Sequence, residues 1–150
     1  MESIHDKVER LCKTHGTRDP YLLCDALDIV VIVCGLPKTV YGFYQYMKRN
    51  HIIYLNAALS DTRRRLVCAH ELGHAVLHRD MGATFLEAEG REVVGRLERE
   101  AEIFCLCLLK GEHLGDCEVD GVPLETLSAV SDLHKKLEDT TLRSPRAGYR

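Results

Sequence analysis

Apolar residues near the N-terminus recur with the spacing of an α-helix, and capping residues mark where two helices should begin. Ser3 is placed to cap a first helix that reaches about Thr14. Asp19 is placed to cap a second helix that begins at Pro20 and reaches Leu27, since proline suits the first helical position. The first helix should bury one apolar face against the rest of the molecule.

The next part of the chain is rich in β-branched and aromatic residues, which predicts strands. Ile29 to Val33 is continuously apolar, as is typical of a buried strand, and Val40 to Lys48 alternates loosely. Arg49-Asn50 is suited to a tight turn into a third strand, Ile52 to Leu55. Together the segments predict a small antiparallel sheet of about three strands.

Helical spacing returns in the second half of the chain. One helix is expected from Arg63 to His78 with Ser60 as its cap, and another from about Glu92 to Lys110. A loop over residues 80–90 should join them.

The last part of the chain predicts one more helix and a tail. Leu124 to Leu137 has apolar residues at helical spacing, so it predicts an amphipathic C-terminal helix. The residues from Thr140 onward are polar and basic and are expected to be disordered. We therefore expect a single α+β domain over residues 1–139, followed by a tail over residues 140–150.

The composition is typical of a soluble globular protein. The 150 residues are 45% hydrophobic and 29% charged, which suits one domain with a substantial core. A net charge of −3 gives no general basic surface for nucleic acid, and the longest apolar run, Ile29 to Cys34, is too short to span a membrane. The first residues lack the pattern of a signal peptide, which predicts a cytoplasmic location.

The pentapeptide HELGH at residues 70–74 has the H-E-x-x-H pattern and falls inside a predicted helix. Four residues turn an α-helix by about 400°, so His70 and His74 point the same way and can reach one zinc ion. Glu71 lies beside them, where it can act as a general base. Apolar residues surround the motif, and a buried helix seldom carries such polar groups without a partner. The pattern predicts a zinc-dependent peptidase.

A catalytic zinc ion usually has a third protein ligand, and the later helix offers two glutamates for it. Glu98 and Glu100 both flank the predicted buried face of that helix, so periodicity does not choose between them. Asp80 stands where metzincins place their third ligand, but Leu77 continues the helix where that arrangement requires a glycine.

The seven cysteines are not expected to bind the metal. Their number is odd, no C-x-x-C pair exists, and no export signal precedes them, which together predict free thiols in a reducing compartment. Cys68 lies just before His70, and Cys105 lies on the later helix. Neither has the spacing of a standard metal ligand. Most should pack as small apolar residues.

Residues 70–78 (HELGHAVLH), followed by Glu98-x-x-Ala101-x-x-Phe104, resemble the two helical motifs of the ImmA/IrrE family of metallopeptidases. A looser similarity in the N-terminal helices and the hairpin extends the resemblance over about residues 15 to 110. It implies a minimal zincin-like domain with one Zn²⁺ ion. The chain departs from the family after the second motif, where it lacks the common Met-Pro.

The resemblance also implies roles for individual residues. Through the related gluzincins, His70, His74 and Glu98 are implied as the metal ligands, ahead of Glu100, with Glu71 as the catalytic base.

Two further residues are expected to support the site, Glu102 from the resemblance and His78 from its place on the helix. Glu102 stands on the position whose side chain can orient a zinc-binding histidine, although it is longer than the family's aspartate or asparagine. His78 continues the histidine stripe one turn further, where a supporting or structural role is expected, or stabilisation by the helix dipole.

The resemblance further implies the substrate and the way it binds. Family members typically cleave an intracellular helix-turn-helix repressor of a phage, a mobile element or a stress response. Zincins bind substrate along an exposed sheet edge, and the candidate edge strand is Ile52, Ile53, Tyr54 and Leu55. Three tyrosines of the preceding strand either line the cleft or face solvent, namely Tyr41, Tyr44 and Tyr46.

Two other functions are weighed against proteolysis. A zincin-like module that binds a repressor without cutting it would not need Glu71, so the intact motif argues against it. The basic cluster Arg63-Arg64-Arg65 and the arginines of the tail are interpreted as solvated charges, so neither nucleic-acid binding nor membrane binding is expected.

Overall fold

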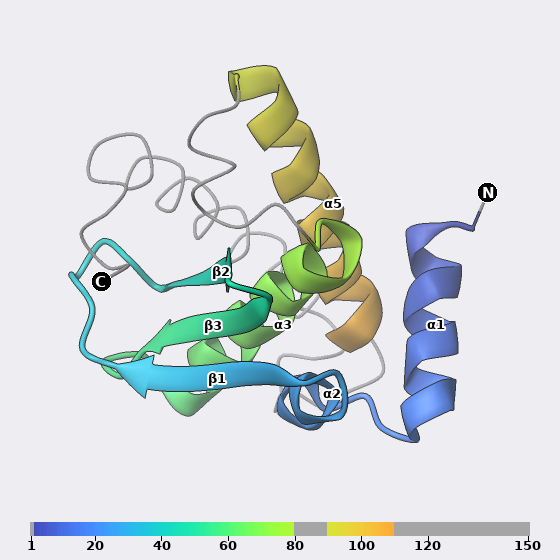
Figure 1. The fold of residues 1–150 in the computed structure, drawn as a ribbon, viewed down its shortest axis with the longest axis horizontal. Coiled ribbons are helices and arrows are strands. Elements are labelled where there is room, and N and C mark those ends of the chain that lie inside the picture. The colour runs from blue at the N-terminus through green and yellow to red at the C-terminus, as the bar shows by residue number, and fades with distance from the viewer. Residues whose placement is uncertain (1, 80–89, 110–150) are drawn as a thin grey trace, which may run out of the picture.

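The computed structural model describes residues 2–79 and 90–109, which contain four helices and three strands (Figure 1). In chain order they are α1 (Ile4–His15), α2 (Pro20–Ala26), β1 (Ile29–Cys34), β2 (Gly42–Met47), β3 (Asn50–Asn56), α3 (Asp61–Leu77) and α5 (Arg91–Leu109). The predicted α+β class is confirmed. The predicted helix at Leu124–Leu137, the tail and residues 80–89 of the predicted loop lie outside the described residues.

Three helices begin at the caps that the sequence predicts. Ser3 accepts a hydrogen bond from the backbone N–H of Asp6, and Asp19 accepts one from Tyr21. The Ser60 side chain does the same for Arg63 at the start of α3. These side chains satisfy backbone donors that have no partner inside the helix, which is why the helices begin there.

The sheet is mixed, and the prediction of an antiparallel sheet is wrong for one of its strands. The strand order is β1-β3-β2, with β2 and β3 antiparallel but β1 and β3 parallel. After β1 the chain crosses to the far edge, forms β2 and returns through the hairpin into the middle. The hairpin signal is local, whereas the partner of β1 is set by this longer connection.

The predicted edge strand is also wrong. Ile52 to Leu55 belong to β3, which pairs with a strand on each side and is therefore the central strand. The two edges of the described sheet are β1 and β2, and only an edge strand has backbone groups free to pair with an added peptide.

The hairpin turn lies one residue earlier than predicted. Met47 pairs with Asn50, so the two turn residues are Lys48 and Arg49, with φ angles of 52° and 68°. Positive φ at both positions matches the twist of a two-residue hairpin. Neither residue is the glycine or asparagine that usually marks such a turn, which explains the misplaced prediction.

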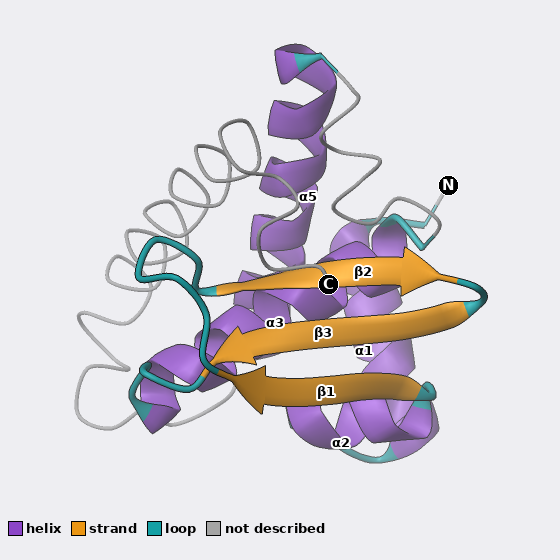
Figure 2. Ribbon diagram, turned by 60° about the vertical axis from the view of Figure 1, so that its left-hand side comes forward, coloured by secondary structure: helices purple, strands orange, loops and turns teal. Residues whose placement is uncertain are grey.

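The helices gather on one face of the sheet, and α3 packs directly against it (Figure 2). Ile53 and Leu55 on the inner face of β3 are fully buried, whereas Val30 on the outer face of β1 is 53% exposed. On its far side α3 packs along α5. This arrangement buries the middle of α3 from both sides. None of the described helices is long and apolar enough to cross a membrane.

Candidate metal centre

The motif side chains lie at the most buried part of α3. His70, Glu71 and His74 are 0%, 2% and 2% exposed because the sheet covers one side of the helix and α5 the other. Such burial is costly for three polar side chains unless each finds a partner. The arrangement agrees with the helical placement predicted from the sequence.

Glu98 of α5 completes a cluster with the two histidines. Its Oε1 atom lies 3.0 Å from Nε2 of His70 and 2.6 Å from Nε2 of His74. Ligand atoms at about 2.0–2.1 Å from a tetrahedral zinc ion are about 3.3 Å apart, so the three atoms would separate by a few tenths of an ångström to admit the ion. Among the described residues, these three form a group that could hold a metal ion.

The other candidate glutamate lies elsewhere. Glu100 Oε1 is 3.4 Å from Nε2 of His78, and the Glu100 side chain is 38% exposed. Two residues further along α5 than Glu98, it is turned away from the histidine pair. Of the two glutamates that periodicity left open, the structure brings Glu98 to His70 and His74.

A close approach of α3 and α5 brings Glu98 within reach. A Cβ atom added to Gly73 would lie 3.1 Å from both the Cα and the carbonyl oxygen of Ala101. These contacts are tighter than those of most Cβ atoms, so a residue without a side chain at position 73 favours the close approach of the helices. Ala101 lies one turn after Glu98, so the contact fixes the distance between the carboxylate and the histidines. The sequence analysis did not identify this role of Gly73.

The cluster fits a bound metal better than an empty core. Glu71 Oε2 is buried beside it without a hydrogen-bond partner. Both Nε2 atoms face the same Glu98 oxygen, where a cation would be attracted to all three. Two imidazoles and one carboxylate suit zinc, and also other divalent metals with nitrogen and oxygen ligands.

The predicted support from Glu102 is not observed. Neither histidine Nδ1 has a hydrogen-bond partner, so the carboxylate does not accept the second ring proton of either imidazole. The charge of Glu102 nevertheless contributes to a raised pKa of His70. Burial acts in the opposite direction on that pKa, and the hydrogen bond and charge of Glu98 outweigh it with the help of Glu71.

Glu71 has the surroundings of a general base. Burial raises the pKa of its carboxyl group, and the charges of His70 and His74 oppose that effect. The carboxylate accepts a backbone hydrogen bond from Tyr44 of β2, which fixes its position, while Oε2 has no partner. A raised pKa brings a carboxylate closer to the range in which it exchanges protons at neutral pH.

His78 joins the end of α3 to α5. Its Nε2 atom lies 3.2 Å from the carbonyl oxygen of Leu97, the residue before Glu98. Burial lowers the pKa of His78 to about 4, so it is neutral at pH 7 and its interaction with the helix dipole carries no full charge. The structure therefore gives His78 a structural contact beside the cluster.

The cysteines near the site are packed in the core. Cys68 Sγ is 4.0 Å from Cys24 Sγ, and Cys105 Sγ is 3.7 Å from the carbonyl oxygen of Leu66. All six cysteines of the described residues are free thiols. Burial raises the pKa of Cys105, which disfavours the thiolate that binds metals.

The tyrosines of β2 and of the residue before it are not simply exposed to solvent. Tyr41 and Tyr44 are buried, and Tyr46 is half-buried. The hydroxyl of Tyr44 donates a hydrogen bond to the carbonyl oxygen of Arg79, just after α3.

Asp80, the third position considered for a ligand, lies outside the described residues.

Comparison with known proteins gives two kinds of match. The peptidase family M78 model, described as the IrrE N-terminal-like domain, matches residues 24–114. The "uncharacterized immunity region protein 2" of Bacillus phage phi105 is 40% identical over 102 residues, which cover 68% of this chain and 65% of that protein. Metallopeptidase ImmA of Bacillus subtilis (strain 168) is 30% identical over 105 residues, covering 69% of this chain and 60% of ImmA. The chain thus spans less than two thirds of either relative.

Proposed function

The chain belongs to the peptidase M78 family of IrrE N-terminal-like domains, and on that basis we propose that it is a zinc-dependent endopeptidase. One observation carries the proposal. A buried group of two histidines and a glutamate, His70, His74 and Glu98, lies beside Glu71, a buried carboxylate with one unpaired oxygen. A purely structural core would not retain so many unsatisfied polar atoms.

Each residue has a part in peptide hydrolysis. His70, His74 and Glu98 would hold the ion, which supplies a Lewis acid that polarises a carbonyl group and lowers the pKa of water. Glu71 would take the proton from the attacking water through its unpaired oxygen. It would then return that proton to the leaving amine, which restores the carboxylate for the next cycle.

The edge strand β2 is the proposed binding site for the substrate backbone. We choose β2 in place of the strand expected from the sequence, residues 52–55, because those residues lie in the middle of the sheet. β2 runs past Glu71, as the backbone hydrogen bond from Tyr44 shows. A peptide added along β2 would therefore pass close to the proposed base.

The proposed substrate is an intracellular helix-turn-helix repressor. This follows from the family resemblance, and it is supported by two relatives whose names refer to a metallopeptidase and to a phage immunity region. The proposal places the protein in the cytoplasm beside such a repressor.

The test compares Glu71→Gln with a matched variant, Glu100→Gln, on the same candidate repressor. Glu71→Gln should retain the metal but cleave about 100-fold to 10,000-fold more slowly, because the general base is lost. Glu100→Gln should cleave at the wild-type rate, since Glu100 lies outside the cluster. If Glu71→Gln relieves repression as well as the wild type does, the protein acts by binding and the peptidase proposal fails.

A further inference from the structure

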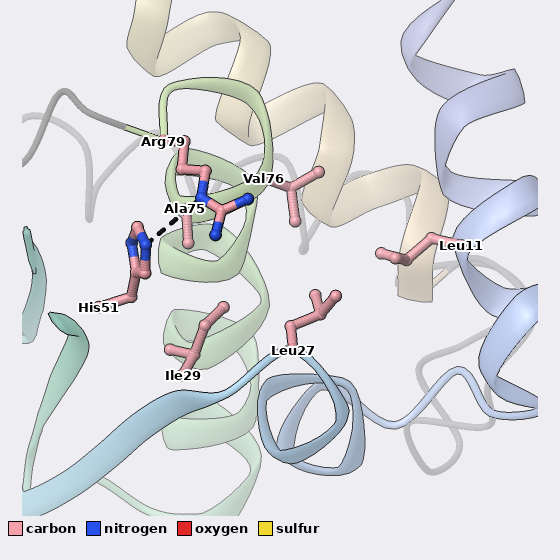
Figure 3. A pocket seen from close by; sticks show the side chains of 7 residues that line it. All are labelled: Leu11, Leu27, Ile29, His51, Ala75, Val76 and Arg79. Carbon is pink, nitrogen blue, oxygen red and sulfur yellow. Dashed lines mark hydrogen bonds between the residues drawn. The ribbon is translucent and has the colours of Figure 1, made fainter. Parts of the chain in front are cut away.

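A cavity of about 140 Å³ lies beside α3 (Figure 3). Its two α3 residues, Ala75 and Val76, are on roughly the opposite side of that helix from His70 and His74, since each residue turns an α-helix by about 100°. Among the described residues that line it, five are aliphatic and two are basic or polar: Leu11, Leu27, Ile29, Ala75, Val76, His51 and Arg79. They come from α1, α3, β1, β3 and the segments after α2 and after α3. The cavity therefore shares no lining residue with the proposed metal centre.

The apolar part of the cavity has the size of a small hydrocarbon. An engineered apolar cavity of about 150 Å³ in another protein binds benzene, which has six carbon atoms. The walls formed by Leu27, Ile29 and Val76 provide a similar lining. A ligand of about five or six carbon atoms, counting the carbon of a carboxylate group, would fill this space without forcing the helices apart.

The other part of the cavity holds a guanidinium group in a fixed position. Nε of Arg79 donates a hydrogen bond to Nε2 of His51 at 3.3 Å, so the ring proton of neutral His51 lies on Nδ1. That nitrogen donates to the Tyr44 hydroxyl, which in turn donates to the Arg79 carbonyl oxygen. The arginine is thus held at its backbone and at its side chain by one closed set of hydrogen bonds.

No described residue occupies the terminal nitrogens of Arg79. Figure 3 shows them directed toward the space beside Ala75 and Val76. Within residues 2–79 and 90–109, the only side-chain hydrogen bond of Arg79 is the one to His51, and no carboxylate pairs with it. A fixed guanidinium group with no acid partner among these residues favours a carboxylate, which it can bind through two parallel hydrogen bonds.

We propose that this cavity binds a short branched aliphatic carboxylic acid, with its carbon chain among the aliphatic side chains and its carboxylate on Arg79. The site combines an apolar space of limited volume with one cation at its rim, the usual composition of a small-molecule pocket. Binding here does not require that the protein is a peptidase.

The test titrates the full chain with 3-methylbutanoate and follows the Arg79 Nε–H signal by NMR. Saturable shifts are expected at millimolar or lower concentrations. Acetate has the charge without the carbon chain, and 3-methylbutan-1-ol has the chain without the charge. Each should bind at least tenfold more weakly than 3-methylbutanoate. If acetate binds as well as 3-methylbutanoate, the apolar cavity contributes nothing and the proposal is overturned. The absence of any saturable shift would overturn it too.

Two variants separate the two halves of the site. Arg79→Gln should weaken binding at least tenfold without unfolding the protein, because Arg79 is exposed. Val76→Phe should abolish binding by filling the cavity. Arg63→Gln, at an exposed arginine near the other end of α3, is the matched control and should bind as the wild type does. Wild-type affinity in either Arg79→Gln or Val76→Phe, in a folded protein, would contradict the proposal.

Discussion

Two buried polar centres in this protein differ in whether the chain itself satisfies them. At the end of β3, the Asn56 side-chain amide donates to the carbonyl oxygens of Leu36, Pro37 and Val40 at 3.2, 3.2 and 2.9 Å. Its oxygen accepts from the backbone N–H of Ala58 at 3.0 Å. Every polar atom of this side chain thus has a partner in the loops around it.

The cluster on α3 lacks this internal satisfaction. His70 Nδ1, His74 Nδ1 and Glu71 Oε2 are buried and have no hydrogen-bond partner. An unsatisfied buried polar group costs about 1–3 kcal/mol, so the fold retains these groups at a loss. The contrast teaches that Asn56 stabilises the fold, whereas the cluster turns two ring nitrogens and a carboxylate oxygen toward one point at a cost to stability, as a metal site would.

The largest effect expected from this contrast concerns metal binding. His74→Ala should lower the affinity for Zn²⁺ by about 100-fold or more, since it removes one of three proposed ligands. Added Zn²⁺ should then raise the melting temperature of the wild type but not that of the variant, because a ligand stabilises only the state that binds it. Calorimetric scans with and without the ion measure this difference. An equal rise in both proteins would remove His74 from the proposed site.

The next effect concerns the satisfied centre. Asn56→Ala should lower the free energy of unfolding by about 2–3 kcal/mol, because it leaves buried carbonyl groups and an N–H group without their partner. Chemical denaturation measures the change. Asn50→Ala, at an exposed position of the same strand, should change stability by less than about 0.5 kcal/mol. If Asn56→Ala abolishes metal binding in a folded protein, the contrast between a structural Asn56 and a metal-binding cluster is wrong.

A smaller effect tests how the two helices position the cluster. Gly73→Ala should destabilise the protein by about 1–3 kcal/mol and weaken metal binding, since the new methyl group would press on the backbone of Ala101. Gly95→Ala on α5 should instead stabilise by about 0.5–1 kcal/mol. The added atom there would meet only the end of the Arg99 side chain at 3.4 Å, and alanine favours the helix. Thermal unfolding should therefore show a lower stability for Gly73→Ala and a higher stability for Gly95→Ala. Stability changes of the same sign would contradict the proposed contact.

The sequence predicted those features of the fold that depend on local signals. The caps at Ser3, Asp19 and Ser60 are each formed by a side chain and a backbone N–H two or three residues away, so a short segment contains all the necessary information. The same holds for His70 and His74, whose common direction follows from helix geometry alone.

Features that depend on distant parts of the chain could not be predicted from these patterns. The parallel pairing of β1 with β3 depends on a connection that crosses the sheet, and it made the predicted edge strand a central one. The choice of Glu98 over Glu100 depends on the approach of two helices at Gly73, which periodicity does not contain. There the family resemblance implied the same residue that the structure brings to the histidines.

The most direct test of the central claim is the zinc content per chain of the wild type, Glu98→Gln and Glu100→Gln. The account predicts about one ion per chain in the wild type and in Glu100→Gln, and a clear loss in Glu98→Gln, because of these two glutamates it is Glu98 that meets His70 and His74. Undiminished zinc in Glu98→Gln, or no zinc in a wild type supplied with the metal, would contradict it.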